Sequence, residues 1–378
     1  MIEHLNMIPD YLREQIKNDD LKFMNTDLSD FKLPTYNPKI HYLELTRSGY
    51  FRSLIILRHY IKVVSDYYFG VECGAKNIDL FMLTPSISSP AGPGSDSEAI
   101  PIKFGKYDSN LVDSSQFGFE PLLLNGIDKV YCYLPSIRGE KPDKRHLNQF
   151  FHCEAEIKGD IEQLILIIEE YIKILAEALI LMPNILERVS LNFKKSMASF
   201  NKILGLERFP KITFDEAANA LMENGNKTLV KVTRLGRNIS SEGEIKLAEI
   251  FNFNTPFWVR NYDRDRVAFY HKPDPKNSNK VINADLIFPP IIKEAFGGEI
   301  VGCGQRQDDC QEIRDSLARQ NINSGPYEWY LNLRKLPNYK TTSGFGLGIE
   351  RFITWSLCRD DIKNSILYPR LKNIKTYP

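Results

Sequence analysis

A charged segment in the first half of the chain carries side chains suited to binding a nucleotide. Arg138 and Glu140 are followed by Arg145, His146 and then Phe150. Guanidinium groups form bidentate hydrogen bonds with phosphate oxygens. A glutamate can accept a hydrogen bond from an exocyclic amine, and a phenylalanine can stack on a purine. The segment therefore indicates a hairpin loop that binds a polyphosphate. The alternative is an ordinary solvated charged loop.

Two acidic residues further along the chain could hold a divalent cation. Asp285 and Glu299 lie in neighbouring strand-like segments, and carboxylate oxygens are preferred ligands of Mg²⁺. The alternative is a pair of edge-strand acids matched with surface lysines. Glycines around Glu299 favour the first interpretation because they let a ligand approach the backbone closely. These glycines are Gly297, Gly298, Gly302 and Gly304.

A third segment near the C-terminus alternates glycine with other residues and ends on a cation. Gly344, Gly346 and Gly348 are followed by Glu350 and Arg351. A glycine repeat alone is a weak signal for a nucleotide site. Here Arg351 follows directly at a predicted junction of strand and helix, where it could reach a phosphate. The alternative for Arg351 is a surface ion pair.

Together these segments resemble the catalytic core of class II aminoacyl-tRNA synthetases of the aspartate/asparagine type. Residues 138–150 resemble motif 2 of that family, residues 344–351 resemble motif 3, and residues 298–306 are similar to the strand before motif 3. Residues 51–84 resemble a loose motif 1, with extra residues around position 75. The resemblance runs from about residue 45 to the end. It implies an α+β class II synthetase fold, with a mainly antiparallel sheet flanked by helices.

The resemblance implies an adenylate-forming enzyme that uses ATP and Mg²⁺. Arg138 would bridge the amino-acid carboxylate and the α-phosphate, and Phe150 would stack under an adenine whose amine is read by Glu140. Arg351 would cover the other adenine face or the γ-phosphate. The implied metal ligands are Asp285 and Glu299. The implied ATP-binding set is Arg138, Glu140, Arg145, His146, Phe150, Glu299 and Arg351, of which Arg138 and Arg351 would be catalytic.

The segment around Phe119 resembles the part of these enzymes that recognises the amino acid. Aspartyl enzymes carry a lysine where this chain has Phe119, whereas asparaginyl enzymes carry an apolar residue followed by a glutamate, here Glu120. Glu120 could accept from a side-chain amide and would repel aspartate. The resemblance also assigns Arg306 to the side-chain carbonyl, and Glu154 with Gln116 to the α-ammonium. We therefore expect asparagine ahead of aspartate. Core packing is the alternative role for Phe119.

These side chains depend on helices and strands that the apolar pattern predicts. Residues 86–97 form a Gly/Pro/Ser loop, either a lid or a plain connector, and it lacks the Glu-Gly pair of the family's closing loop unless Glu98 replaces it. The predicted helices are 51–68, 161–182, 214–222 and 308–320. The predicted strands are 79–84, 129–137, 150–157, 257–262, 266–271 and 298–305.

Composition limits the classes of protein that remain. Lys and Arg number 49 against 48 Asp and Glu, so net charge gives no support for a nucleic-acid partner. The six cysteines are scattered without a CxxC pair, which is typical of reduced thiols. The apolar stretch 161–182 is interrupted by Glu169, Glu170, Lys173 and Glu177 and is not a membrane span. We expect a cytoplasmic protein with no membrane partner.

We expect two parts, an N-terminal arm over residues 1–45 and a catalytic domain over residues 46–378 with a helical insertion at about 158–225. The arm is too short for an anticodon-binding β-barrel, which needs roughly a hundred residues. The first hypothesis is therefore an AMP-forming ligase that passes asparagine or aspartate to a non-tRNA acceptor or ammonia. The alternatives are a tRNA ligase without that barrel and a non-catalytic regulatory paralogue. Motif 1 implies a homodimer through the helix at 51–68.

Overall fold

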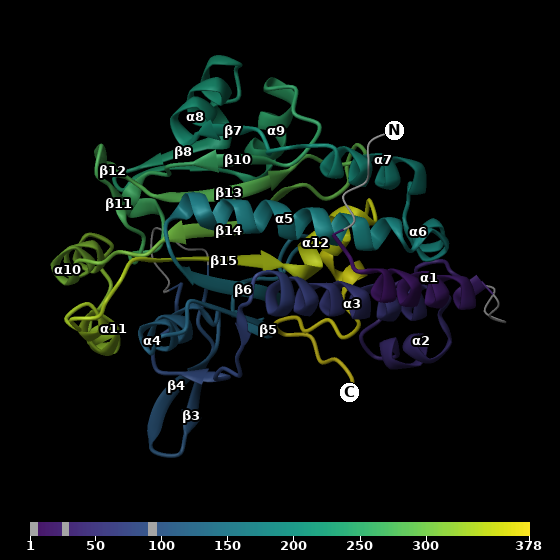
Figure 1. Cartoon of the computed structure of the whole chain (residues 1–378), viewed down its shortest axis with the longest axis horizontal. Coiled ribbons are helices and arrows are strands. Elements are labelled where there is room, and N and C mark those ends of the chain that lie inside the picture. The colour runs from purple at the N-terminus through teal and green to yellow at the C-terminus, as the bar shows by residue number, and fades with distance from the viewer. Residues whose placement is uncertain (1–6, 25–29, 90–96) are drawn as a thin grey trace.

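An eight-stranded sheet forms the centre of the computed structural model, which describes residues 7–24, 30–89 and 97–378 (Figure 1). The five inner pairings, from β5 to β10, are antiparallel, and the edge strands β1 and β7 pair in parallel. The predicted α+β class with a mainly antiparallel sheet is confirmed. In spatial order the strands are β1 (Lys76–Asn77), β5 (Lys129–Ile137), β6 (Gln149–Lys158), β15 (Thr342–Gly348), β14 (Gly298–Gln305), β13 (Asn283–Phe288), β10 (Phe257–Arg260) and β7 (Lys211–Thr213).

The central strands present apolar side chains on one face and site residues on the other, as the period of two along a strand requires. The apolar face belongs to the main core and includes Cys153, Ala155, Val301, Cys303, Phe345 and Leu347. Between these positions lie Glu154 and Glu156 of β6 and the glycines of β14 and β15. The glycines thus leave this face of the sheet almost without side chains, beside the buried carboxylates of Glu154 and Glu156.

Helix α5 (Ile161–Ile180) packs along the apolar face, in contact with β14 and β15 (Figure 1). Its internal charges have partners inside the protein. Glu169 accepts from the indole nitrogen of Trp258 at 2.9 Å, and the Lys173 ammonium donates to the carbonyl of Glu207 at 2.9 Å. None of the described helices is long and apolar enough to cross a membrane.

The N-terminal helix α1 (Asp10–Met24) packs into the same core as the sheet. Leu12 and Ile16 are buried there, and Arg13 forms an ion pair with Glu177 of α5. The described part of residues 1–45 is therefore docked on the larger unit instead of extending as an arm. Helix α2 (His41–Arg47) then leads into α3 (Gly49–Tyr67), which matches the helix predicted at 51–68.

The region predicted as a helical insertion contains α5, α6 (Pro183–Val189), α7 (Phe193–Leu204) and α8 (Phe214–Glu223). A capping box between Thr213 and Glu216 begins α8. Strand β7 of this region pairs with β10 of the main sheet, so the region is joined to the catalytic fold through backbone hydrogen bonds.

Two strand predictions were wrong: one strand does not form and the other is much shorter than predicted. Residues 266–271 form no strand, because a 3₁₀ turn (η4, Arg264–Arg266) bends the chain and Phe269 and Tyr270 pack inward with α11 (Glu328–Leu333). Only β2 (Leu83–Thr84) remains of the strand predicted at 79–84. Most of the predicted loop at 86–97 lies outside the described residues. Glu98, the possible replacement for the closing-loop glutamate, is ion-paired to Lys372 at 3.0 Å.

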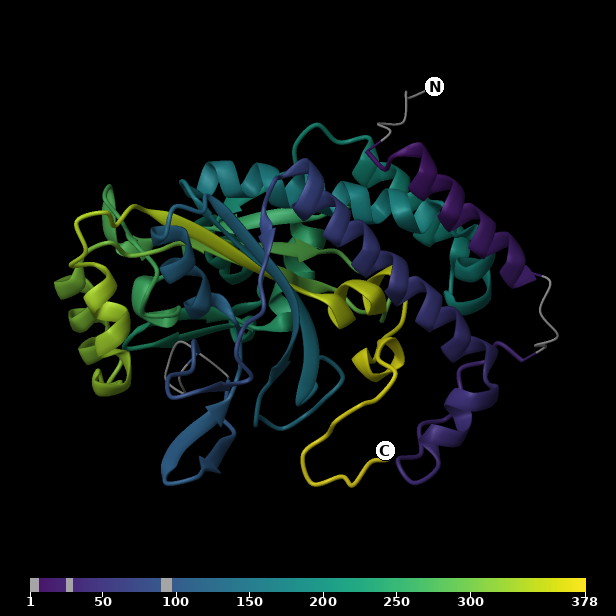
Figure 2. The ribbon, with the colours of Figure 1, turned by 60° about the horizontal axis from the view of Figure 1, so that its bottom comes forward.

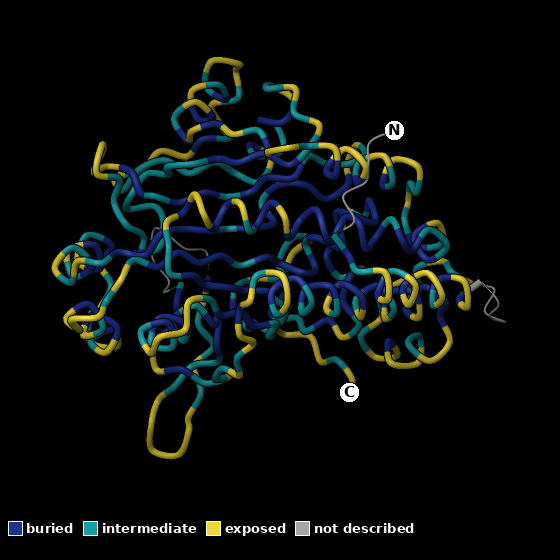
Figure 3. Tube along the Cα trace, viewed as in Figure 1, coloured by how far each residue is buried: buried dark blue, intermediate teal, exposed yellow. Residues whose placement is uncertain are grey.

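A hairpin of β3 (Pro101–Phe104) and β4 (Tyr107–Leu111) projects from the body, exposed along most of its length, while the central strands are buried (Figures 2 and 3). The remaining helical elements are η1 (Tyr68–Glu72), η2 (Gln116–Gly118), α4 (Phe119–Leu124), η3 (Lys227–Leu229), α9 (Ser241–Ile250), α10 (Cys310–Arg319), η5 (Gly325–Tyr327), α12 (Ile349–Ser356) and η6 (Ile362–Ser365). The remaining strands are β8 (Val230–Thr233), β9 (Gly236–Ile239), β11 (Pro273–Asp274) and β12 (Asn277–Val281).

Candidate active site

The charged loop between β5 and β6 is held in a defined shape by Asn148. Its side-chain amide donates to the carbonyls of Arg138 and Glu140, both at 2.8 Å. The backbone N–H of Arg138 donates to the carbonyl of Asn148 at 2.9 Å. These hydrogen bonds give the backbone of the segment a defined shape between β5 and β6.

One cavity of about 130 Å³ gathers every residue of the predicted ATP-binding set. Phe150 comes from β6, Glu299 from β14 and Arg351 from α12, so three separate segments meet there. The guanidinium of Arg138 lies 5.2 Å from the ring centre of Phe150. The seven residues are Arg138, Glu140, Arg145, His146, Phe150, Glu299 and Arg351. A neighbouring cavity of about 500 Å³ shares most of this lining and adds Asp285.

Three arginines bring positive charge to this region, beside the carboxylates of Glu140, Glu299 and Glu350 in the same lining. No described residue forms an ion pair with Arg138, and the buried Nε atoms of Arg138 and Arg145 have no hydrogen-bond partner. Burial and the nearby charge of Arg351 lower the pKa of Arg145, and burial with the charges of Arg138 and Arg351 holds the pKa of His152 well below its usual value. Arg351 lies 3.4 Å from the carboxylate of Glu299. A bound polyphosphate would offset this charge.

The two predicted metal ligands converge over a glycine. A Cβ added to Gly302 would lie 3.3 Å from Oε1 of Glu299 and 3.4 Å from Oδ1 of Asp285. Burial and the charge of Glu299 raise the pKa of Asp285 well above its usual value. A third acid, Glu244 at the start of α9, accepts from the backbone N–H of Glu299 at 2.9 Å, and burial raises its pKa as well. Glu244 could not be singled out from the sequence, since an acid in the first turn of a helix is common.

The acid pair of Asp285 and Glu299 fits a hard divalent cation, because its donors are carboxylate oxygens and Arg351, 3.4 Å from Glu299, does not prevent the raised pKa of Asp285. No group of three or more candidate ligands occurs among the described residues. Asp285 and Glu299 would therefore hold Mg²⁺ together with oxygens of the ATP phosphates.

The second half of the site is built around a fully buried ion pair. Arg306 donates through Nε and Nη2 to Glu156, at 3.2 and 3.0 Å, and the exposed fractions of the two side chains are 2% and 0%. Thr342 donates to the same carboxylate at 2.6 Å. Arg306 also lines a separate cavity of about 130 Å³ that extends to Gln116 and Asp285. The charge of Arg306 is thus already balanced, and its remaining role is to donate a hydrogen bond.

Glu154 and Gln116, the residues predicted for the α-ammonium, lie beside each other. A Cβ added to Gly346 would lie 3.4 Å from Oε1 of Glu154 and 3.8 Å from Nε2 of Gln116. Glu154 accepts from the hydroxyl of Ser114 at 2.5 Å and from the backbone N–H of Ser115 at 2.7 Å. These hydrogen bonds lower the pKa of Glu154, but burial outweighs them and raises it above its usual value.

The structure places Phe119 and Glu120 away from that cavity. Phe119 is fully buried, in a cluster with Leu123, Val130 and Cys132, as the packing alternative proposed. Glu120 is ion-paired to Arg334 at 2.8 Å and accepts from the hydroxyls of Tyr330 and Tyr339. Sequence reasoning missed Arg334, because it lies far along the chain from Glu120 and outside every motif.

With this geometry in view, the comparisons with known proteins become informative. The model of the class II tRNA synthetases (D, K and N) matches residues 36–372, and the chain belongs to that family. It is 32% identical over 274 residues to the asparagine–tRNA ligase of Pyrococcus furiosus, an alignment that spans 71% of this chain and 57% of the relative. It is likewise 32% identical over 277 residues to that of Thermococcus kodakarensis, covering 73% and 60%. The chain thus matches less than two thirds of these relatives' length.

Solved structures support the same assignment. The asparaginyl-tRNA synthetase of Pyrococcus horikoshii complexed with asparaginyl-adenylate matches with a TM-score of 0.78 and 26% identity, over 91% of this chain and 74% of that chain. The aspartyl-tRNA synthetase of Entamoeba histolytica, at 16% identity and a TM-score of 0.70, shares the fold. The predicted class II synthetase core of the aspartate/asparagine type is therefore confirmed.

Proposed function

We propose that this protein is an ATP-dependent ligase that activates asparagine as its aminoacyl-adenylate. The observation that carries the proposal is the meeting of Arg138, Arg145 and Arg351 in one cavity, beside a second cavity floored by glycines. The three cations suit a triphosphate, whereas the balanced Arg306–Glu156 pair suits a neutral polar side chain. A purely regulatory paralogue has no need of the acid pair.

The proposed chemistry joins a carboxylate to the α-phosphorus of ATP. A carboxylate oxygen of the amino acid attacks that phosphorus, the bond to the bridging oxygen of the β-phosphate breaks, and pyrophosphate leaves. Arg138 neutralises charge that develops at the α-phosphate, and Arg145 and Arg351 hold the leaving phosphates. Mg²⁺ held by Asp285 and Glu299 would neutralise charge on the phosphate oxygens.

The charge balance around the second cavity favours asparagine over aspartate. Asp285 lines the cavity, while Glu156 balances its only lining cation, Arg306. An aspartate side chain would add another negative charge to buried surroundings that already hold an excess of acids. The carboxamide of asparagine has nearly the same shape and adds no charge.

The relatives favour tRNA as the acceptor. They are named as asparagine–tRNA ligases, and this favours a tRNA ligase over our first hypothesis of a non-tRNA acceptor. That hypothesis rested on the shortness of residues 1–45, from which no conclusion about the acceptor follows.

Pyrophosphate exchange tests the activation step. We expect asparagine to support exchange of labelled pyrophosphate into ATP without tRNA, and aspartate to support at least tenfold less (about 1.4 kcal/mol of discrimination). Transfer of labelled asparagine to tRNA then tests the acceptor. If no proteinogenic amino acid supports exchange, the proposed activity is wrong. If exchange occurs but tRNA is not charged, the non-tRNA acceptor returns as the better hypothesis.

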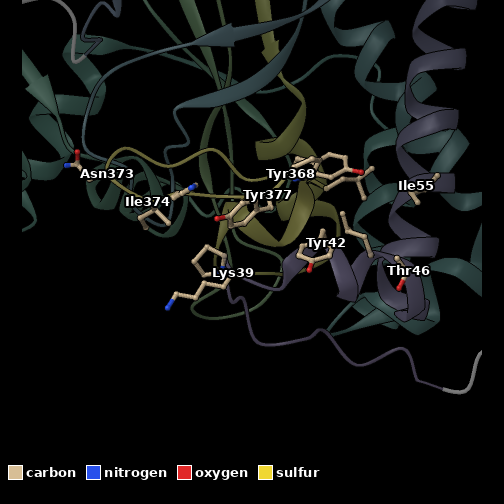
Figure 4. Close-up of a pocket in the computed structure, with 13 residues that line it drawn as sticks. Lys39, Tyr42, Thr46, Ile55, Tyr368, Asn373, Ile374 and Tyr377 are labelled. Carbon is tan, nitrogen blue, oxygen red and sulfur yellow. The ribbon is translucent and has the colours of Figure 1, made fainter.

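We also propose that the protein acts as a homodimer, through a surface beside α3 instead of its apolar stripe. Most apolar positions of the helix predicted to form the dimer are buried in the chain's own core, among them Phe51, Leu54, Leu57, Ile61 and Val64, whereas Ile55 is exposed. A groove of about 1110 Å³ runs between α2, Ile55 of α3 and the C-terminal segment. Figure 4 shows Tyr42, Tyr368 and Tyr377 gathered in it. These three rings and Ile55 are exposed, and a second copy would cover them.

Light scattering after size exclusion tests the dimer. We expect a mass of twice 43.6 kDa for the protein and a shift towards the monomer for Tyr42→Glu. Tyr107→Glu, on the exposed β3–β4 hairpin, is the control and should leave the mass unchanged. A monomeric parent protein would refute the proposal.

A further inference from the structure

Lys372, near the end of the chain, contacts the loop that carries Arg138 and Glu140. Its ammonium donates to the carbonyl of Gly139 at 2.7 Å and to both carboxylate oxygens of Glu98 at 3.0 Å. Gly139 stands between the arginine assigned to the α-phosphate and the glutamate predicted to read the adenine amine. A partner that holds the carbonyl of Gly139 therefore acts on the position of both.

The turn that presents Lys372 is itself bound to the loop through its backbone. The N–H of Lys372 donates to Oδ1 of Asn148 at 2.5 Å, and the N–H of Asn148 donates to the carbonyl of Arg370 at 3.1 Å. The N–H of Ile374 donates to the carbonyl of Leu371 at 3.0 Å and closes the turn. Because Asn148 is also the residue that shapes the loop, the C-terminal segment and the loop are joined by several hydrogen bonds.

Glu98 brings a second segment against the same part of the loop. Its carbonyl accepts from the N–H of Gly139 at 2.6 Å, and its own N–H donates to Oε2 of Glu140 at 3.3 Å. A Cβ added to Gly139 would lie 3.1 Å from the carbonyl oxygen of Glu98 and 3.2 Å from that of Ala99, so glycine permits this close approach. Lys372 binds Gly139 and Glu98 together and thereby fastens the two segments.

The ion pair alone does not explain this arrangement. The side chains of Lys372 and Glu98 are 43% and 56% exposed, and exposed ion pairs contribute little to stability. The hydrogen bond from the ammonium to the carbonyl of Gly139 is charge-assisted and partly buried, which makes it the stronger contact. Loss of Lys372 should therefore affect the position of the loop more than the stability of the fold.

We propose that Lys372 is a positioning residue for ATP. By holding the carbonyl of Gly139 and the carboxylate of Glu98, it fixes the backbone that carries Arg138 and Glu140. The two side chains then meet the nucleotide without first ordering their loop, and this saves binding free energy. The inference rests on the proposed function and adds to the nucleotide site a residue that lies 233 positions along the chain from Gly139.

Isothermal titration calorimetry with ATP and Mg²⁺ tests the role on the whole chain. In Lys372→Met the Kd for ATP should rise about fivefold, as expected for the loss of one partly exposed hydrogen bond. Lys372→Arg keeps a charged donor and should bind ATP within about twofold of the parent protein. Lys141→Met removes an exposed positive charge from the same loop and is the matched control, which should also stay within about twofold.

Pyrophosphate exchange distinguishes positioning from a general structural role. In Lys372→Met, KM for ATP should rise about fivefold. KM for asparagine should stay unchanged, because none of the residues that Lys372 contacts lines the amino-acid cavity. The thermal unfolding temperature should change by less than about 2 °C.

The outcomes separate this inference from the proposed function. Parent-like ATP binding by a folded Lys372→Met, or equal weakening by Lys141→Met, overturns the role of Lys372. Equal rises in KM for both substrates, or failure of Lys372→Arg to restore ATP binding, also overturn it. A parent protein that does not bind ATP refutes both proposals. If the parent binds ATP with the predicted dependence on Lys372, but no proteinogenic amino acid supports exchange, the role of Lys372 stands and the proposed activity fails.

Discussion

The two halves of the site use arginine in opposite ways. In the nucleotide half, Arg138 has no ion-pair partner among the described residues, and Arg351 lies 3.4 Å from its nearest carboxylate. In the amino-acid half, Arg306 is paired at 3.0 Å with the buried Glu156, and outside that cavity Arg334 is paired at 2.8 Å with the buried Glu120. Open cations attract an anion from solution, whereas paired ones contribute shape and hydrogen bonds. The comparison indicates that Arg138, to which we assign a role in binding ATP, keeps its charge without an ion-pair partner among the described residues.

Arg138→Ala should have the largest effect on activity. Because no described residue forms an ion pair with this guanidinium, its loss should lower exchange about a thousandfold with little change in stability. Pyrophosphate exchange and thermal unfolding measure the two effects. Lys141→Ala, an exposed cation of the same loop, is the matched control and should lower exchange less than about twofold. Comparable loss in both variants would mean that loop charge as a whole, and not Arg138, matters.

Arg334→Met should have the largest effect on stability. It leaves Glu120 buried without its cation, so the free energy of unfolding should fall by about 3 kcal/mol. Arg351→Met removes a looser contact and should cost about 1 kcal/mol or less while reducing exchange strongly. Denaturant titration of the pair provides the measurement. Equal destabilisation by both substitutions would remove the contrast between open and paired arginines.

Asp285→Asn should stabilise the protein while it impairs catalysis. The folded-state pKa of Asp285 lies above its unfolded-state value, so the folded protein binds more protons between the two values and its stability falls as pH rises through that window. At pH 7 the substitution should raise the free energy of unfolding by about 1.4 kcal/mol for each unit of pKa shift. Denaturant titrations from pH 4 to 8 without Mg²⁺ check this. A variant less stable than the parent at pH 7 would contradict the assignment of uncompensated charge.

Phe150→Leu should have the smallest effect of the five substitutions. It removes an aromatic surface next to Arg138 and should raise KM for ATP about fivefold, since an aromatic stack contributes about 1 kcal/mol. KM for asparagine should not change. Phe104→Leu, on the exposed β3–β4 hairpin, controls for general effects of the substitution. An unchanged KM for ATP would exclude Phe150 as the adenine platform.

The nucleotide half could be predicted from the sequence because its residues stand close together in short segments. Arg138 to Phe150 belong to one hairpin, and Arg351 follows its glycines directly. The amino-acid half could not be predicted from the sequence, because its side chains are paired with residues far along the chain. Glu120 and Arg334 are 214 residues apart, and a glutamate that looks free in the sequence is occupied in the fold.

The strand predicted at residues 266–271 does not form. Its apolar run resembles a strand, but Phe269 and Tyr270 face a core cluster and leave His271 turned towards the cavity. The packing of aromatic rings decided the local structure there, and the alternation of residue types did not reveal it.

The binding of a stable asparaginyl-adenylate analogue is the most direct test of the account, because one ligand spans both halves of the site. Isothermal titration calorimetry with the sulfamoyl analogues of asparaginyl- and aspartyl-adenylate provides the comparison. We predict that the asparaginyl analogue binds at least tenfold more tightly than the aspartyl one (about 1.4 kcal/mol), and that Arg138→Ala weakens both. Equal binding of the two analogues, or tighter binding of the aspartyl one, would contradict the central claim.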